Sequence, residues 1–425
     1  PKQNIAIGPG TRYTFGGWVK VEKGKPKPQV CLGWCDVSNK WISCVYATPV
    51  TDNDAGTGGW TRYEGRTPPM PSNAATGMLH CHMLRGETGR VLFDDFSLEE
   101  TQAQVKRLRL RLDGFLYSPK LLYCLQLGFT PYDTKVLPNG NNNFIRDAVV
   151  CYRPSDTWNI AFGQTTVKSS RENIKSSSAM QFSNASIVNS EFNPDRDFGF
   201  FGEYYKRLFG NFNVTANAAV TLGEGRNWVA SKSKGFTYTG RVELFPLGRF
   251  KASGEVIEGD FLREQSVKLM LAGAFSYNDR TTRVHGQCGS QLPDGVMASM
   301  KQYYLDFVLK YRGFAFCADF MGRICDKPLY FGDLFTYAGK GVNAQTSYIF
   351  RKNWEVALRN STLLPDAKVR PMVGYTGFNQ TTFAVTKYLI GHSLKVQADA
   401  SYNHRTEALN AYNRWQLRFV LEAGL

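Results

Sequence analysis

Strict alternation of apolar and polar side chains constrains the sequence from about residue 104 onward more than any other feature. The first run, KRLRLRLDG, alternates three leucines with three arginines: Leu108, Leu110 and Leu112 against Arg107, Arg109 and Arg111. The last run alternates in the same way: Trp415, Leu417, Phe419 and Leu421 against Arg414, Gln416, Arg418 and Glu422. A period of two gives a β-strand one apolar and one polar face. This part of the chain is therefore predicted to be all-β.

The apolar faces of these strands are expected to contact lipid. No apolar run reaches the roughly 18 residues of a membrane-spanning helix, whereas strands of about ten residues cross a bilayer at a tilt. Tight turns such as YSPK and IGHS alternate with long loops at 130–142, 168–195, 223–234, 279–299, 323–339 and 362–376. This rhythm is typical of outer-membrane proteins. Because lipid cannot satisfy an open strand edge, the pattern predicts a transmembrane antiparallel β-barrel.

The charge distribution divides the sequence into two parts. Residues 1–100 carry 11 Lys and Arg against 10 Asp and Glu, whereas residues 101–425 carry 40 against 26. We therefore expect two domains, 1–100 and 101–425. A basic excess raises nucleic acid as a partner, but no zinc-finger, KH or RNP1 pattern occurs, so none is expected. The nine cysteines show no CxxC, and we interpret them as small buried apolar side chains.

Residues 12–99 predict a β-sandwich of short strands separated by turn-rich loops. The order of GTRYTFGGWVKV, a strand at Trp60, AATGMLHCHML and GRVLFDDFSLEE resembles the carbohydrate-binding-module type of jelly roll. That family begins with one or two further strands, so this sandwich is either incomplete or unusual. The resemblance implies a structural calcium near the run Phe93, Asp94 and Asp95. Trp34, Trp41 and Trp60 are candidates for stacking on sugar rings, with core packing as the other interpretation.

His80 and His82 flank Cys81 and share one strand face in this part of the sequence. Two ligands do not make a metal site, so no metal is expected there.

Long segments of the remainder resemble one family. The runs VKRLRLRLDGFLYSPKLLYCLQLGF, WNIAFGQTTVKSSRENIKSSSAMQFSNASIVNSEFNPDRDFGFFGEYY, LDFVLKYRGFAFCADFMGR and FRKNWEVALRNS are similar, in this order, to the phosphate-selective porin O/P family in its Bacteroidota-like form. The resemblance covers about 104–425. It implies about sixteen strands, a homotrimer, and the outer membrane of a Gram-negative bacterium. About fifteen strands are recognisable from 104 onward, so one strand is either missing or supplied near 77–99.

Charged side chains of such a barrel are expected to face its interior, because lipid exposure costs about 2–4 kcal/mol near the midplane. Alternation adds further inward cations to the row Arg107, Arg109 and Arg111: Arg241, Lys310, Arg351, Arg359, Lys395, Arg414 and Arg418. Two interpretations are open. The row is a ladder that guides phosphate or carboxylate, or it is a set of structural arginines paired with carboxylates such as Asp399 and Glu422. Glu243, Asp306, Asp319 and Glu355 share the interior, which favours a broad pore over tight phosphate selectivity.

The segment 168–195 stands where the porin family has a loop that folds inward and constricts the channel. Small serines at 169, 170, 176, 177 and 178 would keep it slim. We predict Lys168, Arg171 and Lys175 at the constriction.

The resulting functional hypothesis is an outer-membrane porin for passive diffusion of small solutes with a phosphate-like anion preference. Its partners would be lipid and small anions, and no cofactor is expected apart from the calcium above. The alternative is a membrane anchor or assembly partner that displays a glycan- or protein-binding sandwich through residues 1–100. Enzymatic activity is not expected, because no G-x-S-x-G occurs and the five histidines suit no membrane-embedded Ser–His pair.

Overall fold

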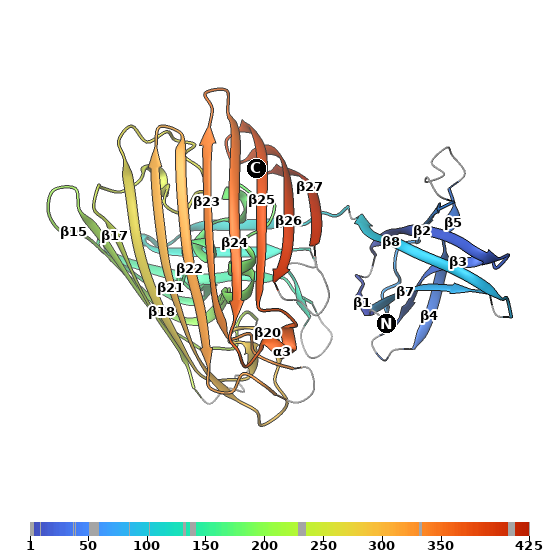
Figure 1. The fold of residues 1–425 in the computed structure, drawn as a ribbon. Coiled ribbons are helices and arrows are strands. Elements are labelled where there is room, and N and C mark those ends of the chain that lie inside the picture. Colours follow the sequence, from blue (N-terminus) through green and yellow to red (C-terminus); the bar gives the residue numbers. More distant parts are fainter. Residues whose placement is uncertain are drawn as a thin grey trace. The chain divides into compact units, whose positions relative to one another are not determined.

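The chain forms two compact units, Pro1–Val105 and Lys106–Leu425 (Figure 1). The computed structural model describes residues 4–8, 10–36, 38, 40–50, 59–84, 86–101, 103–130, 133–136, 142–227, 235–330, 334–406 and 413–424.

The first unit consists of two four-stranded antiparallel sheets. One has the order β1 (Asn4–Ala6), β7 (Thr76–Met83), β3 (Pro28–Cys35), β4 (Trp41–Tyr46), and the other β5 (Thr48–Pro49), β6 (Thr61–Arg66), β2 (Arg12–Gly24), β8 (Gly89–Thr101). Both sheets contribute to one core, in which Phe15 and Val19 of β2 are buried together with Val30, Leu32 and Trp34 of β3. The unit is therefore a β-sandwich, and Trp34 packs in its core.

The predicted calcium site falls on side chains outside the described part of this unit, because those of Asp94 and Asp95 are not described. Among the residues that are described, no cluster of three or more His, Cys, Asp or Glu could hold a metal ion.

The second unit is a fifteen-stranded antiparallel sheet that curls into a barrel wall (Figure 1). Its order follows the chain: β9 (Arg109–Leu116), β10 (Ser118–Gly128), β13 (Ile145–Ser155), β14 (Trp158–Thr166), β15 (Arg196–Arg207), β16 (Asn213–Thr221), β17 (Thr237–Phe245), β18 (Lys268–Thr281), β21 (Ala298–Tyr311), β22 (Phe314–Cys325), β23 (Gly339–Ile349), β24 (Trp354–Pro365), β25 (Gly377–Ile390), β26 (Leu394–Thr406) and β27 (Asn413–Ala423). The predicted all-β barrel class is confirmed. Within the described ranges, no helix has the length and apolar content to cross a membrane.

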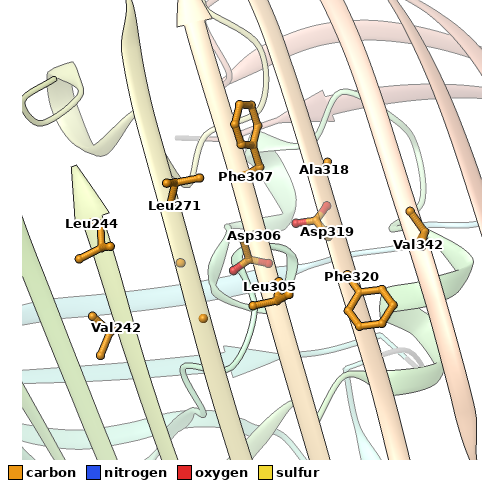
Figure 2. Close-up of a pocket in the computed structure, with 12 residues that line it drawn as sticks. Val242, Leu244, Leu271, Leu305, Asp306, Phe307, Ala318, Asp319, Phe320 and Val342 are labelled. Atoms are coloured by element: carbon orange, nitrogen blue, oxygen red, sulfur yellow. The ribbon is translucent and has the colours of Figure 1, made fainter. Parts of the chain in front are cut away.

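Exposure along the strands is the reverse of that in a water-soluble protein. Leu305 of β21 is 58 % exposed, whereas the adjacent Asp306 is 4 % exposed. Figure 2 shows this alternation: Asp306 lies between Leu305 and Phe307, and Asp319 of β22 lies between Ala318 and Phe320. Charges exposed to lipid and leucines exposed to water would both be costly, so the leucine face contacts lipid. On this outer face an apolar hollow of about 500 Å³ is lined by Val242, Leu244, Leu271, Leu305, Phe307 and Val342.

Two connections are much longer than their neighbours. The first, 167–195, joins β14 to β15 and contains α1 (Arg171–Ile174), the 3-10 helix η1 (Ser177–Ala179) and α2 (Ile187–Phe192). The second, 246–267, joins β17 to β18 and contains the 3-10 helix η2 (Lys251–Ser253). It leaves the end of the sheet where the other connections are tight turns, such as 312–313 and 350–353. The remaining short elements are β11 (Lys135–Val136), β12 (Asn142–Asn143), β19 (Arg283–His285), β20 (Cys288–Gln291) and α3 (Arg370–Val373).

Candidate functional site

Serine caps shape the connection 167–195. The Ser170 hydroxyl accepts a hydrogen bond from the Asn173 backbone N–H at 3.2 Å and begins α1, and Ser186 caps α2 through Asn189 at 3.0 Å. A serine at the N-cap satisfies a backbone donor that the helix leaves free. Ser170 and Ser186 are both fully buried, so the segment fits closely against its surroundings.

Helix α2 packs on an apolar patch of the inward face of the wall. Its Val188 and Phe192 share one core with Tyr304 of β21, Met321 of β22 and Leu363 of β24. The Tyr304 hydroxyl also donates to the Phe192 carbonyl at 3.0 Å. This contact places the predicted constriction segment inside the barrel.

Arg171 joins the same segment to the wall. Its guanidinium donates to both carboxylate oxygens of Asp319, with Nη2–Oδ2 2.8 Å and Nε–Oδ1 3.2 Å, and its backbone N–H donates to Asp306 at 2.9 Å. Arg241 of β17 also lies 2.5 Å from Asp306 and donates to the Ser169 carbonyl at 2.8 Å. Both arginines are buried, so they fasten the segment instead of extending freely into the interior.

The connection 246–267 reaches Arg171 from the opposite end of the barrel. Glu258 of this connection lies 3.3 Å from Arg171 Nη1 and also pairs with Lys175. Its backbone N–H donates to the Ala179 carbonyl at 3.1 Å, and its Oε2 accepts from the Gln181 backbone N–H at 2.8 Å. Burial opposes ionisation of Glu258, but Lys175 and Arg171 hold the pKa of its carboxyl well below the ordinary value. One buried carboxylate thus joins segments from both ends.

The arginine row and Arg418 face carboxylates. The pairs and their N–O distances are Arg107–Glu422 3.3 Å, Arg109–Asp133 2.8 Å, Arg111–Asp113 2.7 Å and Arg418–Asp399 3.3 Å. The Arg111 and Asp113 side chains are 60 % and 50 % exposed, so this pair lies in open space. These ion pairs are the contacts that the interpretation of the row as structural arginines requires. The role of the row as a ladder that guides anions is a matter for experiment.

Three other predicted cations bind carbonyl oxygens instead. Lys310 donates to the carbonyls of Gly254, Ile257 and Gly259, Lys395 to those of Ser178 and Met180, and Arg359 to that of Asn184. The Arg359 guanidinium also lies over the Phe182 ring, 4.4 Å from its centroid. Within the described part of the chain, no carboxylate forms an ion pair with Lys310, Lys395 or Arg359. Their positive charge is therefore not neutralised by an adjacent ion pair.

Lys168 lies apart from these contacts. Its Nζ is 2.6 Å from Glu203 of β15, beside a cavity of about 250 Å³ between the segment and strands β13–β17. Lys175, by contrast, pairs with Glu172 at 2.9 Å and with Glu258. The three cations predicted at the constriction are thus divided: Arg171 and Lys175 are buried in ion pairs, and Lys168 borders open space.

Some residues of this interior were not singled out from the sequence. Arg323 of β22 lies 3.3 Å from Glu191 of α2. Asp319, Met321 and Arg323 follow one another at a period of two, so alternation could have placed Arg323 on the inward face. Arg146 of β13 pairs with Asp133 and is buried. Glu258 and Arg146 gave no such signal, because neither lies within an alternating run that identifies its face.

An antiparallel sheet with leucines toward lipid, charges toward its interior and an inward-folded segment that narrows the interior defines an outer-membrane β-barrel channel, that is, a porin. Residues 85–247 match the model of the family described as Phosphate-selective porin O and P. The match begins within the first unit and ends just after β17, and it confirms the resemblance to this family. The barrel is a porin of the outer membrane of a Gram-negative bacterium.

Solved porin structures are similar over nearly the whole chain. The outer-membrane channel DcaP of Acinetobacter baumannii is 10 % identical, with 97 % of this chain and 96 % of that chain covered and a TM-score of 0.42. OmpT of Vibrio cholerae is 8 % identical, with 97 % and 94 % covered and a TM-score of 0.43. OmpF of Salmonella typhi, in complex with daunomycin, is 8 % identical, with 98 % and 99 % covered and a TM-score of 0.47. No curated protein sequence matches the chain.

Proposed function

We propose that this porin passes small solutes by passive diffusion, with a preference for phosphate-like anions, and that it performs no covalent chemistry. Lys310, Lys395 and Arg359 carry the proposal, because each donates to carbonyl oxygens in the interior and forms no ion pair with a carboxylate of the described residues. Cations beside a low-dielectric wall raise the local anion concentration. The excess of Lys and Arg over Asp and Glu in residues 101–425 acts in the same direction.

The reversal potential across planar bilayers under a potassium chloride gradient tests this preference. The full chain is expected to favour chloride, and Lys395→Gln is expected to reduce that preference, because glutamine keeps a donor to Ser178 and Met180 but loses the charge. Lys387→Gln is the matched control, since Lys387 lies on the outward face of β25 and donates to the Lys352 carbonyl at 2.7 Å. Equal reversal potentials for wild type and Lys395→Gln would contradict the proposal.

We also propose that the barrel assembles as a homotrimer. Four polar side chains form a hydrogen-bonded group on the outward face of β24 and β25: Asn360, Thr362, Asn379 and Thr381. Polar groups of this kind serve as contacts between membrane-spanning segments. Replacing Asn360 and Asn379 together by leucine should shift the mass of the detergent-solubilised protein from trimer to monomer, and an unchanged mass would remove this surface from the interface.

The first unit supports a second candidate function, the display of a glycan-binding surface. Trp41 of β4 is 48 % exposed, and its ring lies over Gly33 of β3, where no side chain intervenes. Tyr46 on the same strand is 51 % exposed. Flat exposed aromatic rings suit sugar faces. Retention of the full chain on immobilised glycans should fall for Trp41→Ala and not for Trp354→Ala in the barrel, and equal retention would exclude this surface.

A further inference from the structure

The cavity beside Lys168 is built from the inward faces of five neighbouring strands and one turn of the constriction segment. Its volume is about 250 Å³, and its lining includes Cys151, Asn159, Ala161, Lys168, Ile174, Phe201, Glu203, Asn217, Ala219 and Thr239. The segments that fill the interior along β21–β26 do not fill this side. The cavity is therefore unfilled space on the inward face of the wall.

A polar row crosses the cavity. Asn159, Glu203 and Asn217 face one another directly on β14, β15 and β16. Glu203 accepts from Lys168 at 2.6 Å and from the Asn159 amide at 3.5 Å. The Asn159 Oδ1 atom and both amide atoms of Asn217 have no hydrogen-bond partner among the described residues, although all three atoms are buried. Buried amides need partners, and a solute rich in hydroxyl groups supplies both donors and acceptors.

An apolar floor lies next to this row. Phe201 is paired with Ala161 on one side and Ala219 on the other, so the residues directly opposite it on both neighbouring strands have only a methyl side chain. Ile174 of α1 adds apolar surface from the constriction segment. An apolar surface with a few fixed polar groups is the usual composition of a small-molecule site.

We propose that this cavity is a binding site for a neutral polyhydroxyl solute about the size of one pyranose ring. The ring of Phe201 would contact the C–H face of the sugar, and Asn159, Glu203, Asn217 and Lys168 would bond to its hydroxyl groups. Lys168 and Glu203 neutralise each other, so the binding site has no net charge that would attract a phosphate dianion. The proposal that solutes bind here during transport rests on the proposed channel function. It adds neutral polyhydroxyl solutes to the anions that the channel would pass.

Glucose is the probe for the full chain reconstituted in planar bilayers. Wild-type chloride current should fall with a saturable dependence on glucose after correction for the bulk conductivity of each solution. Asn217→Leu and Phe201→Leu should each raise the half-saturating concentration about fivefold or more, since each removes one class of contact. Phe320→Leu, the same change on the lipid-facing side (Figure 2), should leave it unchanged.

Binding in detergent, measured by saturation-transfer NMR of glucose, separates the two proposals. Current without a saturable glucose effect, or a half-saturating concentration unaltered in both cavity variants, would overturn the proposed binding site and leave the proposed channel function intact. A barrel that carries no current but binds glucose in a Phe201-dependent manner would overturn the channel and keep the site.

Discussion

Glu258 Oε1 lies 3.3 Å from Nη1 of Arg171, and the two side chains are 1 % and 0 % exposed. Arg171 belongs to the connection after β14, and Glu258 belongs to the connection after β17, which leaves the other end of the sheet. Because Arg171 also forms two hydrogen bonds with Asp319 of the wall, this contact fixes three separate parts of the barrel to one another. The width of the interior where the connection 167–195 enters it therefore depends on the buried Arg171–Glu258 ion pair.

Replacement of Glu258 by glutamine should destabilise the barrel. The variant leaves Arg171 and Lys175 buried with less compensating charge, and removal of one partner of a buried pair costs about 3–5 kcal/mol. Thermal unfolding in detergent should show a lower midpoint, and single-channel current should become noisier as the segment loosens. Glu255→Gln is the control on the same connection, because the Glu255 Oε2 atom is buried without a hydrogen-bond partner in the described structure; a loss as large as that of Glu258→Gln would contradict the role of the pair.

Replacement of Arg107, Arg109 and Arg111 by glutamine should lower the preference for anions. The three carboxylates that these arginines face, Glu422, Asp133 and Asp113, would remain and attract cations. The ratio of chloride to potassium permeability, taken from the reversal potential, measures the change. Unaltered selectivity would remove the row from the mechanism and leave it a structural role.

Alternation in the sequence was sufficient to predict the strands and their two faces. Asp306 was assigned to the interior by a period of two, and the structure has it 4 % exposed, whereas the adjacent Leu305 is 58 % exposed. Local spacing carries this information because a strand turns each successive side chain to the other face. The expected inward segment 168–195 came from the family resemblance, not from spacing.

Partners inside the barrel could not be predicted in the same way. Arg171 and Asp319 are separated by 148 residues, and Arg171 and Glu258 by 87. Their contacts depend on the curvature of the sheet and on the path of two irregular connections, neither of which leaves a periodic pattern. The connection 246–267 was a visible interruption between two alternating runs, but nothing in its composition indicated that it enters the interior.

Stability should fall between about pH 4.3 and about pH 7 because of Glu191 on α2. Burial raises the pKa of its carboxyl to about 7, although Arg323 opposes part of the rise. The groups around it are Arg323 at 3.3 Å, His285 at 3.5 Å, and the hydroxyls of Tyr337 and Tyr375. Burial and Arg323 lower the pKa of His285 to about 3, so this histidine stays neutral in the window.

The sign follows from linkage. Glutamate in the unfolded chain titrates near pH 4.3, so the folded protein binds the Glu191 proton more tightly. Its contribution is complete below about pH 4.3 and is lost as the pH rises through about 7. The pKa difference corresponds to about 3.5 kcal/mol, so the unfolding midpoint in detergent should drop by about 5–10 °C over this range, and Glu191→Gln should remove that part of the pH dependence. A midpoint that rises with pH in wild type, or an identical slope in Glu191→Gln, would contradict the assignment.

Two native cysteines report which side of the interior is open. Cys151 of β13 borders the cavity beside Lys168, whereas Cys317 of β22 is 2 % exposed and packs with Met270 and Val308. In chains that keep only one of these two cysteines, a charged methanethiosulfonate reagent should react with Cys151 and roughly halve the single-channel current, because the bound group narrows the path. Cys317 should not react in the folded barrel. Modification of Cys317 at the rate of Cys151 would mean that the interior along β21–β26 is as open to solvent as the cavity beside Lys168, which would contradict this expectation.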